Sequence, residues 1–299
     1  MICPRLSVAP LIPSRQIVPL FLHIPKTAGT TLSHCIYDQY ANGPKTSPEQ
    51  REERGWLCEG VFYYPSGFLK PEEPVIPSWV RCALARDDIS AVVGHFRFGI
   101  HRFVQKPSTY VTLIREPIDR VVSLYYHLAL DDTTLQGITL DEFISLRELR
   151  EIDNDQTRRI AGLEPPFGRC NEKTLARAKN NLVQHFSVVG VTHRFDETLV
   201  MLRRMLDWGD LYYLPVLISE TRPARSRIPA ATVDRIAAHN RFDEELFRFG
   251  ETLLDEAIAA QGPDFAVELQ AFKALNAQHI ARWTGLGAIP SDTAQLSKK

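Results

Sequence analysis

One short stretch combines a lysine, a glycine and three threonines in a pattern suited to phosphate binding. It consists of Lys26, Thr27, Ala28, Gly29, Thr30 and Thr31. An apolar run at 17–24 predicts a buried strand before it, and helical spacing predicts a helix from 30 to about 40 after it. A helix N-terminus presents unpaired N–H groups and partial positive charge, so this loop is predicted to bind an anionic phosphate group. An ordinary threonine-capped turn would explain one threonine, but not the lysine and the hydroxyl run together.

The loop differs from a Walker A loop, which places its glycines ahead of the lysine. Here the only glycine, Gly29, comes after Lys26. Nucleoside triphosphate hydrolysis also needs an acidic residue at a second strand end to hold magnesium. A P-loop kinase or NTPase with a degenerate Walker A loop therefore remains only the second hypothesis.

A histidine follows the next buried strand, predicted at 91–93. Ligands gather at the carboxyl ends of strands in open α/β sheets, and His95 stands there, directly after Gly94. Histidine titrates near neutral pH and can act as a general base. The alternative is a structural histidine of the core.

An arginine and a serine follow a third predicted strand at 110–114. Arg115 stands at its carboxyl end, and Ser123 lies two turns into the helix that begins near residue 118. Because arginine binds phosphate through two parallel hydrogen bonds, this pair could hold a second phosphate. The alternative for Arg115 is an ion pair with Glu116 or Asp119.

The elements that must position these residues alternate between strand and helix. A further strand is predicted at 186–191, and the other predicted helices cover 139–162, 172–185, 192–207, 232–260 and 262–283. This alternation indicates an α/β fold: P-loop-like, three-layered, with a central mainly parallel sheet flanked by helices. We expect one domain over 1–284 and a flexible tail at 285–299.

Three polar or irregular segments have no clear assignment from sequence. Residues 41–80 are predicted as a long loop insertion, either facing an acceptor or forming its own aromatic cluster. The cluster at 154–159 could be a solvated face or an acceptor contact. Arg222, Arg225 and Arg227 could close over an anionic ligand or lie on a solvated face.

Composition narrows the class of protein. The chain has 299 residues, 44% hydrophobic and 24% charged, with net charge −1, as in ordinary globular proteins and without the basic field of a nucleic-acid binder. Five scattered cysteines without a Cys-x-x-Cys pair argue against a zinc site or disulfide framework.

No apolar run approaches the ~20 residues of a membrane span, so a cytoplasmic location is the default expectation. Whether the chain forms a homo-oligomer stays open.

Three motifs together resemble the 2-O-sulfotransferases of heparan and related uronic-acid glycans and their bacterial relatives. HIPKTAGTTL is similar to the family's 5′-phosphosulfate loop, VVGHFRF to its catalytic histidine segment, and LIREPIDRVVSLYYH to its 3′-phosphate motif. The resemblance extends over about 18–255. Their order and spacing make the match specific.

The resemblance implies transfer of a sulfuryl group from 3′-phosphoadenosine 5′-phosphosulfate to a hydroxyl of a glycan or glycoside, without a metal. Lys26 and the N–H groups of 27–31 would hold the 5′-phosphosulfate, and Lys26 would stabilise the leaving phosphate. Arg115 and Ser123 would hold the 3′-phosphate, with Arg222 a weaker candidate, and His95 would be the base.

The chain also departs from the family pattern. Vertebrate members carry a second histidine two residues before the catalytic one, where Val93 stands here, and a lysine-rich late loop is replaced by 218–227. Vertebrate members also have an N-terminal membrane anchor, which we do not expect here. A third hypothesis is a nucleotide-binding module of this fold that has lost catalysis. The acceptor itself is left open.

Overall fold

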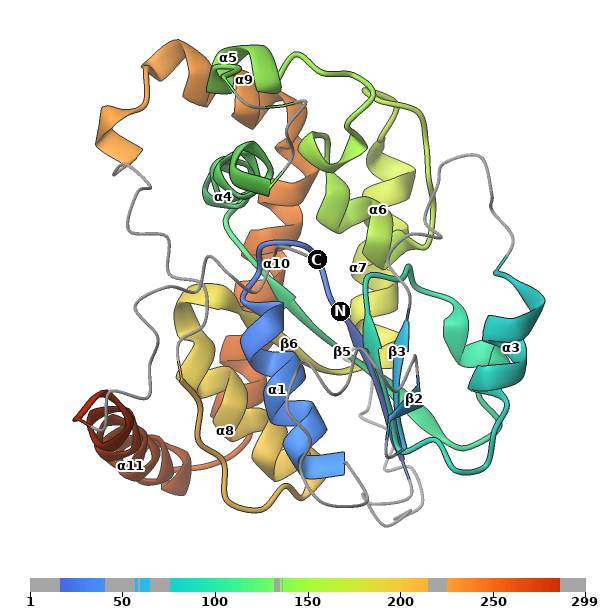
Figure 1. Ribbon diagram of the computed structural model, residues 1–299, viewed down its shortest axis with the longest axis vertical. Coiled ribbons are helices and arrows are strands. Elements are labelled where there is room, and N and C mark those ends of the chain that lie inside the picture. The colour runs from blue at the N-terminus through green and yellow to red at the C-terminus, as the bar shows by residue number, and fades with distance from the viewer. Residues whose placement is uncertain are drawn as a thin grey trace, which may run out of the picture.

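The computed structural model describes residues 17–40, 57–58, 60–64, 76–131, 135, 137–214 and 225–285. Its centre is a sheet of six strands in the order β2-β3-β4-β1-β5-β6 (Figure 1). The strands are β1 (Val18–Leu22), β2 (Leu57–Cys58), β3 (Val61–Tyr64), β4 (Ala91–Gly94), β5 (Ser108–Ile114) and β6 (Phe186–Val191). All neighbouring pairs are parallel except β2 and β3.

The strands are apolar on both faces, as expected of a parallel sheet covered on both sides. Every residue of β1 is buried, and so are the last five residues of β5. β1 pairs with β4 on one side and with β5 on the other. The residues that follow these three strands therefore meet at one edge of the sheet.

Helices cover both faces of this sheet. The helices are α1 (Gly29–Tyr40), α3 (Ser78–Leu84), α4 (Pro117–Asp131), α5 (Leu140–Phe143), α6 (Asp155–Ala161), α7 (Glu172–His185), α8 (Phe195–Leu206), α9 (Ala230–His239), α10 (Arg241–Ala259) and α11 (Asp264–Gly285). Short 3-10 turns are η3 (Ile100–Phe103), η4 (Arg150–Ile152), η5 (Thr192–Arg194) and η6 (Arg225–Arg227).

Two glycine contacts show which helices lie on opposite faces. A Cβ on Gly190 of β6 would lie 2.2 Å from Cγ2 of Thr198 in α8 and 2.7 Å from Leu113. A Cβ on Gly250 of α10 would lie 2.1 Å from Cδ1 of Ile114. Because successive residues of a strand point to opposite faces, α8 and α10 cover different faces. In Figure 1, α1 lies beside α8, whereas α3 and α7 lie across the sheet. The predicted three-layer α/β arrangement is confirmed.

Two predicted helices are interrupted. The segment 139–162 is not one helix: it contains α5, η4 and α6, and Asn154 before α6 has a φ of 48° in the left-handed region, which a right-handed helix cannot continue. The segment 232–260 divides at Asn240 into α9 and α10. Both interruptions lie where the two segments contact each other, since Asn240 donates to the carbonyl oxygen of Ile152 at 2.9 Å.

The prediction of a loop over 41–80 is wrong for its described part. Val61–Tyr64 forms β3, which extends the sheet by pairing with β4, and α3 begins at Ser78. Leu57–Cys58 forms the short strand β2, and residues 41–56, 59 and 65–75, like the predicted tail beyond Gly285, lie outside the described residues.

The buried apolar residues form two clusters. The larger follows both faces of the sheet, and the smaller joins α4, α5 and α9 around Val121, Phe143 and Ile236. The single domain over 1–284 stays a prediction. Within the described ranges, no helix is both long and apolar enough to cross a membrane.

Candidate active site

The loop after β1 has a backbone suited to an anion. Lys26 and Ala28 both adopt left-handed conformations, with φ of 69° and 65°, although neither is glycine. Left-handed residues alternating with right-handed ones turn successive N–H groups toward one side, which forms a concave anion site. The loop also leads directly into the N-terminus of α1, where the first N–H groups have no helical partner. Backbone and helix end together therefore present N–H groups and partial positive charge in an arrangement suited to an anion.

The threonines of this loop have different roles. Thr27 is fully buried, and its hydroxyl donates to the carbonyl oxygen of Ile24 at 2.8 Å, so this O–H is used inside the loop. Thr31 is also buried, whereas Lys26 and Thr30 are partly exposed. The phosphate prediction depended on a run of three threonine hydroxyls, and the hydroxyl of Thr27 bonds within the loop instead.

Arg115 reaches this loop from the neighbouring strand end. Its Nη1 donates to the carbonyl oxygen of Lys26 at 2.9 Å, so the guanidinium and the lysine lie at the same edge of the sheet. The hydroxyl of Thr192, after β6, lies 3.1 Å from the carbonyl oxygens of both Thr27 and Ile114, so these two acceptors share its single O–H. The loop is thus tied to the ends of both β5 and β6.

The residues around Arg115 have other partners. Glu116 accepts from the backbone N–H of Asp119 at 2.7 Å and forms an ion pair with Arg225 at 3.3 Å. Ser123 lies partly exposed on α4, and its role at a phosphate stays a prediction. Arg222 lies outside the described residues.

His95 directly follows β4 and lies beside the end of β1. Its Nδ1 lies 2.8 Å from the carbonyl oxygen of His23. A carbonyl oxygen only accepts, so Nδ1 carries the proton and Nε2 keeps its lone pair. Burial, followed by the charge of Arg159, lowers the pKa of His95 from 6.5 to about 4. The ring is therefore neutral at neutral pH and able to accept a proton at Nε2.

His23, which the sequence analysis did not single out, connects this histidine to the phosphate loop. Its ring lies 4.2 Å from that of His95 and stacks on Phe21 at 5.5 Å. A Cβ on Gly29 would lie 1.8 Å from Cδ2 of His23, so only glycine fits at the start of α1. Burial, with contributions from the charges of His95, Arg159 and Lys26, lowers the pKa of His23 well below 6.5. Its position at a strand end was the signal that could have identified it.

The polar cluster at 154–159 is buried rather than solvated, because each of its residues is at most 5% exposed. Arg159 binds Asp155 through its Nε at 2.9 and 3.0 Å, and its Nη1 donates to the carbonyl oxygen of His95 at 3.4 Å. Gln156 contacts the backbone of Arg115. Through these hydrogen bonds, the cluster holds the backbone of both His95 and Arg115 in place.

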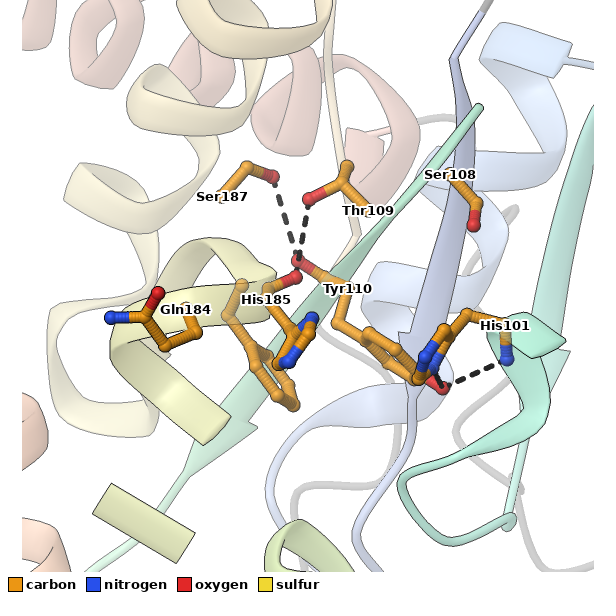
Figure 2. A pocket seen from close by; sticks show the side chains of 8 residues that line it. His101, Ser108, Thr109, Tyr110, Gln184, His185 and Ser187 are labelled. Carbon is orange, nitrogen blue, oxygen red and sulfur yellow. Dashed lines mark hydrogen bonds between the residues drawn. The ribbon is translucent and has the colours of Figure 1, made fainter. Parts of the chain in front are cut away.

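Among the described residues, neither a metal site nor the cavity described below lies at the sheet edge of Lys26 and Arg115. Within the described ranges, no group of three or more His, Cys, Asp or Glu side chains has the arrangement of a metal site. A cavity of about 230 Å³ (Figure 2) is lined by His101, Tyr110 and His185 among others, at the amino ends of β5 and β6. It therefore lies at the opposite edge of the sheet from Lys26 and Arg115.

The fold and this edge define an α/β protein in which the loop after β1, with the geometry of an anion site, lies between a neutral histidine after β4 and an arginine after β5. The chain belongs to the galactose-3-O-sulfotransferase family, whose model matches residues 3–298. The resemblance expected from the three motifs is thus confirmed at the level of carbohydrate sulfotransferases.

Curated relatives come from two groups of these enzymes. The chain is 26% identical to galactose-3-O-sulfotransferase 3 of Bos taurus over 277 residues, which cover 87% of this chain and 62% of that protein. It is 29% identical to heparan sulfate 2-O-sulfotransferase 1 of Cricetulus griseus over 218 residues, 64% of this chain and 55% of that protein. The chain therefore spans little more than half the length of these relatives. These names do not favour the kinase hypothesis.

Proposed function

We propose that this protein transfers the sulfuryl group of 3′-phosphoadenosine 5′-phosphosulfate to a hydroxyl of a glycan or glycoside. One observation carries the proposal: Arg115 donates to the carbonyl oxygen of Lys26 at 2.9 Å, which joins two cationic residues from adjacent strand ends. A donor with separate 5′ and 3′ anionic groups fits this arrangement, and ATP lacks the 3′ group.

The two ends of the donor would be held by different parts of the edge. The backbone N–H groups of 27–31 and the Lys26 ammonium suit the 5′-phosphosulfate, because they present positive charge to one concave surface. The Arg115 guanidinium lies beside Lys26, and with Ser123 it suits the 3′-phosphate, because arginine binds phosphate through parallel hydrogen bonds.

His95 would take the proton of the acceptor hydroxyl at Nε2. As the acceptor oxygen bonds to sulfur, the bond from sulfur to the bridging phosphate oxygen breaks, and 3′-phosphoadenosine 5′-phosphate leaves. Lys26 would stabilise the charge that develops on this leaving oxygen. Because the pKa of His95 is lowered to about 4, the base is already neutral when the acceptor arrives.

Nucleotide titration and a transfer assay test the proposal. We expect 3′-phosphoadenosine 5′-phosphate to bind more tightly than ATP with magnesium, and radiolabelled sulfate to appear on members of a glycan panel that includes galactosides and heparan-type chains. Preferential magnesium-dependent ATP binding would support the kinase hypothesis instead. Tight binding of the nucleotide without transfer to any glycan would favour an inactive module.

A further inference from the structure

The N-terminal turn of α6 contacts the two chemically important strand ends from one short segment. Its residues come from the polar cluster at 154–159, which the proposed mechanism does not itself use. Gln156 is 1% exposed and Arg159 is 5% exposed. Arg159 contacts the carbonyl oxygen of His95, and Gln156 contacts Arg115. This short segment therefore contacts the backbone of two proposed site residues, His95 and Arg115.

Gln156 binds both backbone polar groups of Arg115. The N–H of Arg115 donates to Oε1 of Gln156 at 2.9 Å, and Nε2 of Gln156 donates to the carbonyl oxygen of Arg115 at 2.8 Å. Arg115 is the first residue beyond β5, where pairing with β6 ends at Ile114 and Val191. Beyond that pair, β6 provides no ladder partner for the backbone groups of Arg115. One side-chain amide thus replaces the missing strand neighbour and fixes the peptide of Arg115.

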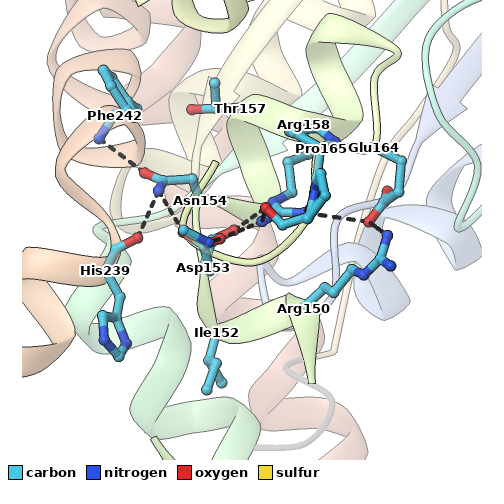
Figure 3. Close-up of polar contacts among 12 residues, drawn as sticks. Arg150, Ile152, Asp153, Asn154, Thr157, Arg158, Glu164, Pro165, His239 and Phe242 are labelled. Atoms are coloured by element: carbon cyan, nitrogen blue, oxygen red, sulfur yellow. Dashed lines mark hydrogen bonds and ion pairs between the residues drawn. The ribbon is translucent and has the colours of Figure 1, made fainter. Parts of the chain in front are cut away.

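Gln156 is itself held by reciprocal helix caps between α6 and α10. Asp243 accepts from the N–H groups of Gln156 at 3.1 Å and Thr157 at 2.8 Å, and from the Thr157 hydroxyl at 2.7 Å. In return, Oδ1 of Asn154 accepts from the N–H of Phe242 at 2.9 Å (Figure 3). It also accepts from the N–H of Asp243 at 3.2 Å. Each helix therefore supplies the N-terminal cap of the other.

Ion pairs fix the same turn from its other side. Arg158, 1% exposed, pairs with Asp153 and donates from Nε to the carbonyl oxygen of Asp153 at 2.7 Å. Glu164 lies within 3.4 Å of Nη1 of Arg158 and 3.3 Å of Nη1 of Arg150 (Figure 3). A buried network in which these groups have partners favours one arrangement of the turn.

We propose that Gln156 is a positioning residue for the 3′-phosphate clamp. By fixing the Arg115 peptide, it directs the guanidinium toward the carbonyl oxygen of Lys26 and so sets the distance between the 3′ and 5′ anion sites. This inference rests on the proposed function, because it gives Arg115 the 3′-phosphate of the donor.

Replacing Gln156 should therefore lower the preference for 3′-phosphorylated nucleotides rather than the affinity for all nucleotides. Removing the amide leaves the N–H and the carbonyl oxygen of Arg115 without these partners, so the peptide turns to find others. The guanidinium then moves away from the 3′-phosphate. The 5′ anion site is formed by the backbone of 26–31 and the start of α1, and neither hydrogen bond between Gln156 and Arg115 reaches these residues, so we expect this site to stay in place.

The experiment compares two nucleotides in Gln156→Met and Gln156→Asn. The first removes both hydrogen bonds at similar volume, and the second keeps an amide too short to reach both groups. Affinity for 3′-phosphoadenosine 5′-phosphate should fall at least about tenfold, the equivalent of one hydrogen bond. Affinity for adenosine 5′-phosphate, which lacks the 3′ group, should change less than about twofold.

Thr157→Val is the matched control. It removes one buried side-chain bond to Asp243 from the same helical turn without touching Arg115. It should lower stability while leaving the ratio of the two affinities unchanged. Equal losses for both nucleotides in the Gln156 variants, or no loss, would overturn the inference while leaving the proposed function intact. If the unmodified chain did not prefer the 3′-phosphorylated nucleotide, the proposed function would fail first and this inference with it.

Discussion

The carbonyl oxygen of His23 lies 2.8 Å from Nδ1 of His95, and the two imidazole rings lie 4.2 Å apart. The first residue after β1 thus sets both the tautomer and the orientation of the first side chain after β4. Because His23 also lies against Gly29, the same residue connects the base to the start of α1. The base and the anion loop are therefore parts of one packed unit.

Replacing the base should separate chemistry from binding. In His95→Ala, the affinity for 3′-phosphoadenosine 5′-phosphate should stay nearly unchanged, because the anion sites lie on other residues. Sulfate transfer should fall at least ~10²-fold, the usual contribution of a general base. Titration calorimetry and a transfer assay on the same preparation measure both quantities. Normal turnover in this variant would remove His95 from the mechanism.

The protonation of His95 gives a prediction about pH. Its pKa in the folded chain is lowered to about 4 by burial and then by Arg159, so Nε2 keeps its lone pair well below neutral pH. We expect the imidazole carbon resonances of His95 to titrate near pH 4, and kcat/KM to show no histidine limb near pH 6.5. A half-loss of activity at pH 6.5 that follows the His95 resonances would contradict this.

The same shift has a consequence for stability. A histidine that is neutral in the fold but takes a proton near pH 6.5 when unfolded favours the unfolded chain as the pH falls. The part of the free energy of unfolding that comes from keeping His95 neutral in the fold is fully present above pH 6.5 and is lost as the pH falls toward about 4. His23, with its pKa also lowered, acts in the same direction. Urea unfolding at pH 7.5 and pH 5 should show a smaller free energy of unfolding at pH 5.

The contact of His23 with Gly29 predicts a specific rescue. In Gly29→Ala the new methyl group would overlap the His23 ring at 1.8 Å, and overpacking of this kind costs ~1–3 kcal/mol. Combining it with His23→Ala removes the ring and should restore most of the free energy lost through Gly29→Ala. Gly209→Ala is the control, since the nearest atom to its Cβ is Oε1 of Gln39 at 3.9 Å. Additive losses in the double variant would show that the contact is not the cause.

Local patterns predicted the parts of the fold that depend on local burial. The apolar runs of β1, β5 and β6, and the periodic helices α1, α7 and α8, lie close to their expected bounds. The strand β3 was missed because four residues with three aromatics do not differ in pattern from a loop cluster. Its assignment depends on pairing with β4, a contact that is absent from local sequence.

The residues of the candidate site also divide into those that local sequence patterns identify and those that depend on distant contacts. Lys26, His95 and Arg115 could be predicted because each follows a recognisable strand. His23 also follows a strand, but its contact with His95, 72 positions away, is not visible in the sequence, and nothing local identifies Gln156, whose partner Arg115 is 41 positions away. The break at Asn154 was likewise hidden, since its left-handed conformation is stabilised by contacts with Asn240, between α9 and α10, and with Phe242 of α10. Non-local hydrogen bonds therefore decide what propensity alone leaves open.

The final prediction concerns the arginine that joins the two anion sites. Arg115→Ala should weaken binding of 3′-phosphoadenosine 5′-phosphate by about 1.5–3 kcal/mol, as expected for a hydrogen bond to a charged group. Adenosine 5′-phosphate should lose much less, because its single phosphate would lie at the loop. Arg204→Ala, which removes an arginine of α8 paired with Glu268 of α11, is the control and should affect neither ligand. If both nucleotides lost the same affinity in Arg115→Ala, the arginine would be supporting the loop through the carbonyl oxygen of Lys26 rather than binding the 3′-phosphate.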